Sequence, residues 1–324
     1  MAIYFHISDS NDGWKNLATD RFFLERLQKD DIMLYLYMNA NAVIIGRNQN
    51  AWRECNIDAM EKDGVQLVRR HTGGGAVFHD CQNLNFSFIM GEEQYNVTRQ
   101  MGVIQKMVAN LGMTAELSGR NDILIDGRKF SGNAFAASRG MNAHHGTILV
   151  DTDLTKLSNY LNVSAKKMQA KGVTSVKSRV CNLKDFNENV TVETVISLLK
   201  KEFAKEYGDF TEYQFTSQDL AKIEELYREY ASWQWRFGRT PAFNYQLEER
   251  FSFGEMQFLF QVTDGLISEV SVFTDTLDTE LVHLVRERFS GVRFQSGDIA
   301  DALTKTPAKP EFLEIAKYIK EITL

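Results

Sequence analysis

The chain has 324 residues, of which 44% are hydrophobic and 25% charged, and its formal net charge is −6. This length predicts one large domain or two moderate ones. The acidic balance argues against nucleic acid as the main partner, because such binding depends on Lys and Arg that neutralise phosphates. No apolar run approaches the ~18 residues that would span a bilayer, so no membrane association is expected.

Cysteine usage and the first residues favour a reducing compartment. The three cysteines, Cys55, Cys81 and Cys181, are odd in number and form neither a CxxC pair nor a zinc pattern. The segment MAIYFHISDSND (1–12) lacks the basic stretch and apolar core of a secretory signal. We therefore expect three reduced thiols in a cytoplasmic protein.

Proline is scarce and glycine is concentrated. Only three prolines occur, Pro241, Pro307 and Pro310, where average usage of about 5% would give roughly sixteen. Residues 64–146 hold twelve of the 21 glycines. Turns and close approach of backbone to a ligand are therefore expected in that region.

Hydrophobic periodicity predicts alternating helices and strands over the first 150 residues. The apolar runs 32–38 and 42–46, separated by Asn39-Ala40-Asn41, predict a tight β-hairpin. The alternation in LNFSFIM (84–90) predicts a half-buried strand. The other helices expected here are 14–29, 51–63 (with Asn50 as N-cap) and 98–112, and the other strands are 65–70, 121–126, 128–137 and 145–150.

The rest of the chain predicts a helical stretch and then a small α+β unit. Helices dominate residues 153–230, most clearly at 191–207 and 217–230. The segment RFSFGEMQFLFQVTDGLISEVSVFTD (250–275) predicts three strands with turns at Gly254 and Asp264-Gly265. Helices at 278–289 and 310–322 follow. We expect a larger domain at residues 1–245 and a smaller one at 246–324.

A ligand-binding loop is predicted at RRHTGGGAVFHD (69–80). A strand delivers Arg69 and Arg70 to three consecutive glycines, which let backbone N–H groups approach a ligand closely. The arginine fork suits a phosphate or carboxylate. A plain turn needs fewer glycines and no arginine pair. The loop is not a P-loop, since GxxxxGK[ST] is absent.

A second candidate site is SGRNDILIDGRKFSGNA (118–134). Gly127 predicts a hairpin turn, after which Lys129 begins a strand with the small neighbours Ser131 and Gly132. A lysine in a strand is usually solvated. Together with the arginine–glycine loop upstream, however, Lys129 could bracket one anionic ligand.

Two further motifs are less specific. His144 and His145 are adjacent on a predicted strand and therefore point to opposite faces, so they cannot easily ligate one ion together. We expect one of them to hydrogen-bond in a pocket wall, and no structural zinc. The basic segment AKGVTSVKSRV (170–180) fits a solvated loop, a flap over a phosphate-bearing ligand, or a docking strip for an acidic partner.

The order of these motifs resembles the lipoate–protein ligase family, of the bacterial type with a C-terminal accessory domain. The resemblance covers nearly the whole chain, from IGRNQNAWREC (45–55) to FTDTL (273–277). Its carriers are RRHTGGGAVFHD (69–80), GRNDILIDGRKFSGNA (119–134), HHGTILV (144–150), AKGVTSVKSRVCNL (170–183) and SWQWRFGRTPAF (232–243). It implies an α+β fold with a mixed-sheet core like that of class II aminoacyl-tRNA synthetases and biotin ligases, plus a small α+β C-terminal domain.

The resemblance also implies an activity. Such enzymes join lipoate to ATP, giving lipoyl-AMP and pyrophosphate, and then pass the lipoyl group to one lysine of an acceptor domain. ATP and Mg²⁺ are the expected cofactors and lipoate the substrate. The expected acceptors are lipoyl domains of 2-oxoacid dehydrogenase E2 subunits, the glycine-cleavage H protein, or both. A monomer is expected.

Site residues are carried over by position. The catalytic residue is Lys129, which would bond both the lipoyl carbonyl and the phosphate. The expected nucleotide-site residues are Arg70 (phosphate), Gly75, Ala76, Val77 and Phe78 (backbone lining of the adenylate), and Asn121 and Asp122 (near the nucleotide and its Mg²⁺). We expect Gly73, Gly74 and strand residues from 34–45 to wall an apolar lipoate slot. Departures from the family pattern are His71-Thr72, Cys81-Gln82-Asn83 and Asn133.

Three alternatives stay open at this point. The first is an ATP-independent lipoyl or octanoyl transferase, which needs a reactive cysteine beside the lysine. Cys81 is the only thiol near the candidate segments 69–80 and 118–134. The others are a biotin ligase and a catalytically weak lipoyl-binding paralogue. We also expect the joint at 241–250, stiffened by Pro241, to act as a hinge between activation and transfer.

Overall fold

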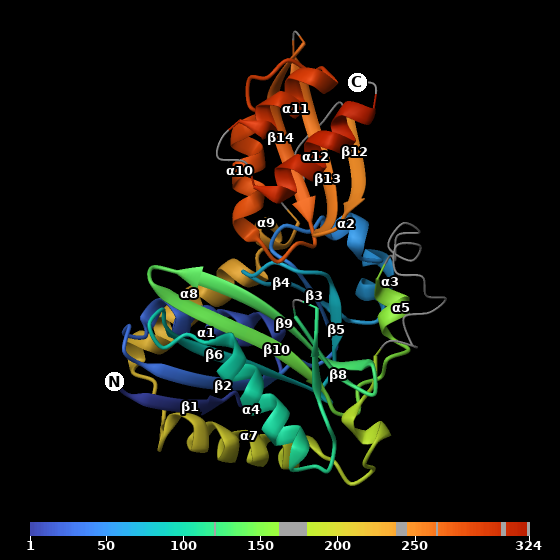
Figure 1. Ribbon diagram of the computed structural model, residues 1–324. Helices are drawn as coiled ribbons and strands as arrows, with labels where there is room; N and C mark the ends of the chain where they lie inside the picture. The colour runs from blue at the N-terminus through green and yellow to red at the C-terminus, as the bar shows by residue number, and fades with distance from the viewer. Residues whose placement is uncertain (120, 162–179, 238–244, 264, 306–308, 323–324) are drawn as a thin grey trace.

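The computed structural model describes residues 1–119, 121–161, 180–237, 245–263, 265–305 and 309–322. These residues form a large body built on a mixed sheet and a small α+β unit, which is drawn above the body in Figure 1. The predicted α+β class, with a mixed-sheet core and a small C-terminal unit, is confirmed.

A mixed sheet of eight strands lies at the centre of the described part of the body, in the order β11-β1-β2-β6-β10-β9-β8-β7. Strand β1 is parallel to both of its neighbours, and every later pair is antiparallel. The strands are β1 (Ile3–Ile7), β2 (Ile32–Met38), β6 (Asn83–Gly91), β7 (Glu116–Ser118), β8 (Asp122–Ile125), β9 (Arg128–Ser138), β10 (Met141–Leu149) and β11 (Thr211–Glu212).

One face of this sheet is covered by helices α4 (Val97–Ala109) and α7 (Val192–Tyr207). Each helix begins behind a side-chain cap, because Asn96 accepts from the backbone of Arg99 and Thr191 accepts from that of Thr194. The apolar residues of β6 point into this layer, where Phe86 and Phe88 are fully buried.

The opposite face is covered by helices α1 (Gly13–Arg26) and α8 (Ser217–Ala231) and by a second, three-stranded sheet. That sheet has the order β4-β3-β5. Its strands are β3 (Ala42–Ile45), β4 (Gln66–Arg69) and β5 (Val77–His79), and the short helices nearby are α2 (Ala51–Glu54), α3 (Ile57–Lys62), α5 (Leu157–Tyr160), a 3₁₀ turn (Leu183–Asp185) and α9 (Trp233–Arg236).

The predicted hairpin of residues 32–38 and 42–46 is wrong. Strand β2 lies between β1 and β6 in the large sheet, whereas β3 lies between β4 and β5 in the second sheet. Because both edges of β2 are occupied, the chain leaves the large sheet after Met38. The connection turns at Asn41, whose φ is 43°. The buried side chain of Asn39 holds it through contacts with Asn16 and His79.

Two other predictions need correction. The strand 84–90 is buried on both faces, with Asn85 and Ser87 2% and 0% exposed, because α1 and the second sheet cover its polar side. The predicted helix 51–63 is two helices, α2 and α3. The break is at Cys55, which forms a β-bridge with Leu161, and the side chain of Asn56 caps α3.

The small unit is an antiparallel meander covered by three helices. Its elements are β12 (Tyr245–Phe251), β13 (Gly254–Thr263), β14 (Leu266–Thr274), α10 (Thr279–Phe289), α11 (Ser296–Thr304) and α12 (Pro310–Glu321). Pro310 occupies the first turn of α12 as predicted. Helix α11 was not predicted, although Ile299, Ala300 and Leu303 have helical spacing and are buried. The domain boundary at 245/246 stays a prediction, and β12 already begins at Tyr245.

The small unit rests on the end of the body that carries the glycine loop. The backbone N–H of Gly74 donates to Thr276 O at 3.0 Å, and that of Thr274 donates to Asn48 O at 2.8 Å. Arg53 forms ion pairs with Glu248 at 2.7 Å and with Glu255 at 2.6 Å. These contacts tie the loop to the small unit.

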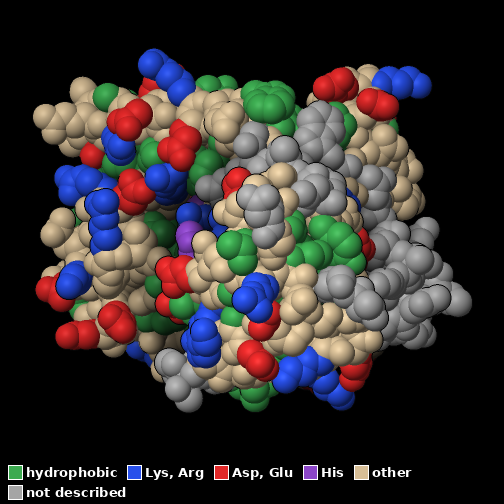
Figure 2. All heavy atoms as spheres, turned by 90° about the horizontal axis from the view of Figure 1, so that it is seen from above, with side chains coloured by type: hydrophobic (Ala, Val, Ile, Leu, Met, Phe, Trp, Pro, Cys, Tyr) green, Lys and Arg blue, Asp and Glu red, His purple; other side chains and the backbone are tan. Residues whose placement is uncertain are grey.

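On the face of the molecule shown in Figure 2, neither positive nor negative side chains predominate. Lys and Arg side chains are interspersed with Asp and Glu there, rather than gathered into one basic patch. No helix among the described residues is both long and apolar enough to cross a membrane.

Candidate active site

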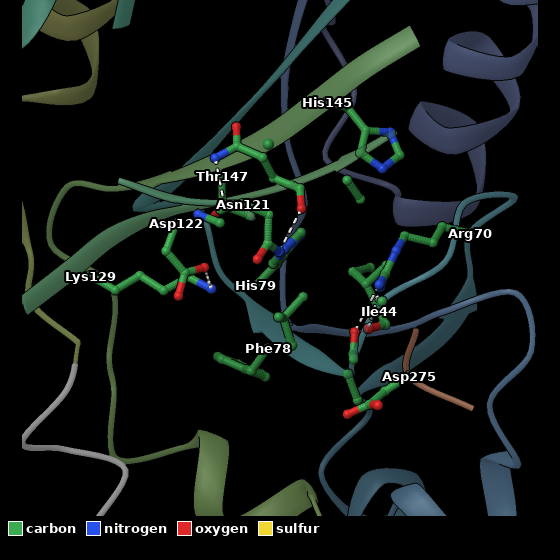
Figure 3. A pocket seen from close by; sticks show the side chains of 18 of the residues that line it. Ile44, Arg70, Phe78, His79, Asn121, Asp122, Lys129, His145, Thr147 and Asp275 are labelled. Carbon is green, nitrogen blue, oxygen red and sulfur yellow. Dashed lines mark hydrogen bonds and ion pairs between the residues drawn. The ribbon is translucent and has the colours of Figure 1, made fainter. Parts of the chain in front are cut away.

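A cavity of about 600 Å³ lies where the large sheet, the glycine loop and the small unit meet. This volume is within the range of small-molecule sites. Every predicted site residue lines it except Gly73: Arg70, Gly74, Gly75, Ala76, Val77, Phe78, Asn121, Asp122 and Lys129. Tyr37 and Ile44, from the predicted wall segment 34–45, line it as well. The arrangement is drawn in Figure 3.

Arg70 shapes the glycine loop from inside. Its Nε and Nη2 donate to Gly73 O at 3.0 and 2.6 Å, and Nη2 also donates to Gly75 O at 2.9 Å. Its Nη1 donates to Ile44 O at 3.3 Å. Burial lowers the pKa of Arg70 to about 10, so the group is still charged at neutral pH. A fixed positive charge therefore lies behind the loop backbone.

Arg69 has a different role from the one that its position beside the loop suggests. It is 1% exposed and donates to backbone carbonyls on two separate segments of the chain. The acceptors are Gly46, Arg47, Gln49, Trp235 and Arg236. Arg69 thus joins the loop after β3 to α9 and does not line the cavity.

Lys129 enters the cavity from β9 and pairs with Asp122 of β8 at 2.7 Å. The two side chains are 33% and 37% exposed, so the pair is open to solvent and to a ligand. A side chain at position 132 would come within 2.7 Å of the Lys129 ammonium group, so glycine there lets the lysine fold back over the strand. This explains the small neighbours noted in the sequence.

Asn121 and Asn133 fix the other edge of this wall. The Asn121 amide donates to Asn133 O at 2.9 Å, and the Asn133 amide donates to Asn121 O at 3.0 Å. Asn133 Oδ1 also contacts His144 Nε2 at 2.8 Å. Asn133, which departs from the family pattern, therefore makes a polar contact with His144.

The two adjacent histidines point to opposite faces of β10, as predicted. His144 is buried on the face that carries α4, where it also contacts Gln100. His145 lies on the cavity face, with Nδ1 3.3 Å from Asp20 Oδ2 and Nε2 2.7 Å from Thr72 Oγ1. Since the Asp20 carboxylate can only accept, Nδ1 carries the proton and Nε2 accepts from the threonine hydroxyl.

His79 is a polar group that sequence reasoning did not single out. Asn39 Oδ1 accepts from Asn16, so the Asn39 amide nitrogen is the donor to His79 Nδ1 at 3.1 Å. The neutral ring therefore carries its proton on Nε2, which has no partner among the described residues. His79 lines the cavity, although its Nε2 atom is itself buried. His79 lies within the predicted ligand-binding loop 69–80, but no feature of the sequence distinguished it from its neighbours there.

The small unit contributes a wall that sequence reasoning also missed. Arg250 and Asp275 line the cavity and form an ion pair at 3.0 Å, and Phe253 and Leu277 line it beside them. Figure 3 shows Asp275 below Arg70, across from Lys129 and Asp122. A family-like segment at 273–277 was the only sequence signal for this wall.

None of the three free cysteines lines the cavity. Cys81 is exposed and lies on a separate surface hollow with Met38 and Lys184. Cys55 and Cys181 are buried, and burial raises their pKa values to about 12 and about 11. The described residues thus offer no activated thiol beside Lys129.

The predicted basic segment 170–180 lies outside the described residues except for Val180. Val180 forms a parallel β-bridge with Lys129, and the N–H of Cys181 donates to Lys129 O at 2.9 Å. The end of that segment is therefore attached to the strand that carries the lysine. Pro241 and residues 242–244 of the expected hinge also lie outside the described residues.

Comparison with known proteins gives matches along almost the whole chain. The family model described as "Lipoyl protein ligase A/B catalytic domain" matches residues 12–204, and the one described as "Bacterial lipoate protein ligase C-terminus" matches residues 240–322. Among solved structures, Plasmodium falciparum LipL1 in complex with lipoate is 28% identical, with 99% of this chain and 100% of that chain covered and a TM-score of 0.87.

Two further structures match the body. A bi-partite lipoate protein ligase from Thermoplasma acidophilum, described with its E2 lipoyl domain, is 31% identical, with 75% of this chain and 98% of that chain covered and a TM-score of 0.66. A lipoate-protein ligase A bound with ATP is 30% identical, with 74% of this chain and 99% of that chain covered and a TM-score of 0.63.

Replacing Gly73 should loosen the small unit from the loop. A Cβ at position 73 would lie 2.4 Å from Thr276 O, whereas one at position 75 meets no atom within 4 Å. We expect Gly73→Ala to speed hydrogen exchange of the Gly74 amide, which donates to Thr276 O, and Gly75→Ala to leave it unchanged. The exchange rate of this amide is measured by mass spectrometry. Equal rates in the two variants would disprove this packing.

His79 should make the protein less stable in mild acid. Burial, with the charge of Arg70 adding to it, lowers the pKa of His79 from 6.5 to about 3. Between those values the unfolded chain binds a proton that the folded chain excludes, so stability is lost as pH falls below about 6.5. From pH 7 to pH 5 this loss is about 2 kcal/mol.

The test is urea unfolding of wild type and His79→Gln at both pH values. The variant lacks the titrating group, so its loss of unfolding free energy should be smaller by about 2 kcal/mol. His283→Gln, at an exposed position of α10, is the matched control and should follow wild type. The same pH dependence in all three proteins would show that His79 does not carry the effect.

Proposed function

Because this chain belongs to the lipoyl protein ligase A/B catalytic-domain family, we propose that its cavity activates lipoate with ATP and then transfers the lipoyl group to a lysine of an acceptor protein. Family membership makes the chain an enzyme, a lipoate–protein ligase, and the C-terminal match extends the family pattern over the small unit. The observation that carries the proposed chemistry is the partly exposed Lys129–Asp122 pair in the same cavity as Arg70 and the glycine loop.

The apolar part of the cavity suits the lipoyl chain. Leu17, Tyr37, Ile44 and Phe78 line it, which is what a pentanoyl chain and dithiolane require. Of the two glycines expected in this wall, Gly74 lines the cavity, whereas a side chain at Gly73 would face Thr276. We propose that Gly74 contacts lipoate directly, whereas Gly73 contributes to the lipoate site only by keeping the loop in its position.

The polar part suits a nucleotide. We propose that the backbone of Gly75, Ala76, Val77 and Phe78 lines the adenylate and that Arg70, bonded to the loop carbonyls, places its charge behind the phosphates. Asn121 and Asp122 lie on the facing wall. Asp122 is a half-exposed carboxylate and therefore fits as the group that would hold Mg²⁺ together with the phosphates. That ion would supply positive charge to the phosphate oxygens.

Lys129 is the group whose charge suits both half-reactions. In the first, the lipoate carboxylate oxygen attacks the α-phosphorus of ATP and pyrophosphate leaves. A substrate anion competes with Asp122 for the Lys129 ammonium, which then bonds the carboxylate and α-phosphate together. This contact is stronger in the more highly charged transition state, which is how it would accelerate the reaction.

In the second half-reaction, the acceptor amine attacks the acyl carbonyl and AMP leaves. We propose that the Lys129 ammonium then polarises that carbonyl by donating a hydrogen bond. No covalent enzyme intermediate is needed, so the absence of a cysteine from the described cavity wall fits a ligase. The same observation disfavours the ATP-independent transferase, which would need a reactive thiol beside Lys129.

The proposed function also indicates the acceptor proteins, the cellular compartment and the oligomeric state. The T. acidophilum ligase is described with an E2 lipoyl domain, and we propose lipoyl domains of 2-oxoacid dehydrogenase E2 subunits, glycine-cleavage H protein, or both as acceptors of this chain. The three free cysteines favour a reducing compartment, and we propose the cytoplasm. We further propose a monomer whose domains divide at residues 245 and 246, with a hinge at 241–250.

Mass spectrometry of acceptor domains tests the proposed function directly. Purified E2 lipoyl domain and H protein are incubated with the enzyme, lipoate, Mg²⁺ and ATP. We expect one lipoyl group on one lysine, and none when ATP is omitted. Modification without ATP from a preformed acyl carrier would support the transferase instead.

Lys129→Ala should lower lipoyl-AMP formation by at least roughly 100-fold, the scale on which losing a major charge-stabilising contact slows an enzyme. The measurement is pyrophosphate release with free lipoate. Lys184→Ala is the matched control, since Lys184 also pairs with an aspartate, Asp151, at 2.6 Å but lies outside the cavity. Near-wild-type release by Lys129→Ala would refute the role of this lysine.

A further inference from the structure

Three side chains from distant parts of the chain converge at the wall of the cavity, which His145 lines. Asp20 comes from α1, His71 from the loop after β4, and His145 from β10. Asp20 Oδ2 lies 3.3 Å from His145 Nδ1 and 3.9 Å from His71 Nε2. One carboxylate oxygen and two ring nitrogens thus lie within 4.8 Å of one another.

The cluster is buried and its polar atoms are incompletely satisfied. Asp20 is 0% exposed, and the side chains of His71 and His145 are 9% and 8% exposed. His71 Nε2 is buried without a hydrogen-bond partner among the described residues, whereas the Asp20 carboxylate also has the Ser87 hydroxyl beside it, which helps to lower the pKa of Asp20. Buried polar atoms normally have a hydrogen-bond partner, because a buried donor or acceptor that makes no hydrogen bond costs about 1–3 kcal/mol. The cluster therefore has the chemistry of a site with an occupant.

Outer contacts orient both rings toward this point. His71 Nδ1 contacts the Tyr230 hydroxyl at 3.1 Å, which leaves Nε2 directed toward Asp20. His145 Nδ1 faces the same carboxylate, and Nε2 contacts Thr72 Oγ1 at 2.7 Å. A cation bound at Nδ1 would shift the ring proton from Nδ1 to Nε2, which would then donate to the Thr72 hydroxyl. Histidine ligands of metals are held in this way, with the second ring nitrogen bonded to a neighbouring group.

The donor set selects a class of cation. Two imidazole nitrogens and one carboxylate oxygen suit Zn²⁺ and similar transition metals, whereas Mg²⁺ and Ca²⁺ prefer oxygen ligands alone. With Zn–N bonds of about 2.0–2.1 Å, neighbouring ligand atoms lie roughly 3.3 Å apart, so His71 needs to move inward by no more than about 1.5 Å.

We propose that Asp20, His71 and His145 form a mononuclear binding site for a divalent cation of the zinc class, separate from the nucleotide site at Asp122. The bound ion would connect α1, the loop after β4 and β10, and its remaining coordination positions would be open to water or a ligand.

The test uses the untagged full-length protein after removal of metals with a chelator. Co²⁺ is titrated and followed by its visible ligand-field absorption, and Zn²⁺ binding is measured by calorimetry. We expect one equivalent of Co²⁺ to bind with the absorption of a low-coordinate site, and Zn²⁺ but not Mg²⁺ to displace it. In a Co²⁺-soaked crystal, the anomalous peak should lie between the three side chains.

His71→Ser should weaken Zn²⁺ binding by at least ~100-fold, more than the loss of a residue that supports a ligand usually costs. Asp20→Asn is the second variant and should act in the same direction, and thermal melting checks that both are folded. His283→Ser, at an exposed position of α10, should bind like wild type. Failure of the wild type to bind Co²⁺, or unchanged affinity in both cluster variants, would overturn the proposal. Either result would mean that the cluster holds a water molecule rather than a cation.

Discussion

Two neighbouring arginines are buried at the centre of this protein, and the cavity is built around them. Arg69 donates to carbonyls of the loop after β3 and of α9, and Arg70 donates to carbonyls within the glycine loop. A buried guanidinium is costly unless its donors are satisfied. Backbone carbonyls must therefore turn inward around each group. The shape of the glycine loop thus follows from satisfying the Arg70 charge, and the shape of the segment after β3 follows from satisfying the Arg69 charge. Lysine, with its compact charge and three donors, could not replace either.

Sequence reasoning predicted those parts of the site that are contiguous in the chain. The loop at 69–80 and the segment around Lys129 each carry their chemistry within a dozen or so residues, and both line the cavity. Long-range pairing escaped prediction. The runs 32–38 and 42–46 have the local pattern of a hairpin. However, β2 pairs on one edge with β1 and on the other with β6, which are distant in the sequence.

Polar residues on a strand gave a second misleading signal. Asn85 and Ser87 alternate with phenylalanines, which normally indicates one solvated face. Here that face is buried, and the Asn85 amide bonds to Asn83 and to Tyr37 O, so its polarity serves internal hydrogen bonds rather than water. His79 and Arg250 were missed for a related reason. Each becomes informative only when another element, Asn39 or the small unit, is placed beside it.

The cavity wall is divided between two folded units, and this division has a thermodynamic consequence. Arg250 and Asp275 stand on the small unit, whereas Lys129 and Arg70 stand on the body. A molecule that touches both walls adds its binding free energy to the association of the two units, and by linkage their association strengthens its binding. Release of a ligand and separation of the units are then coupled events. Substitutions at the distant contacts of Arg53 would therefore alter ligand affinity without touching the ligand.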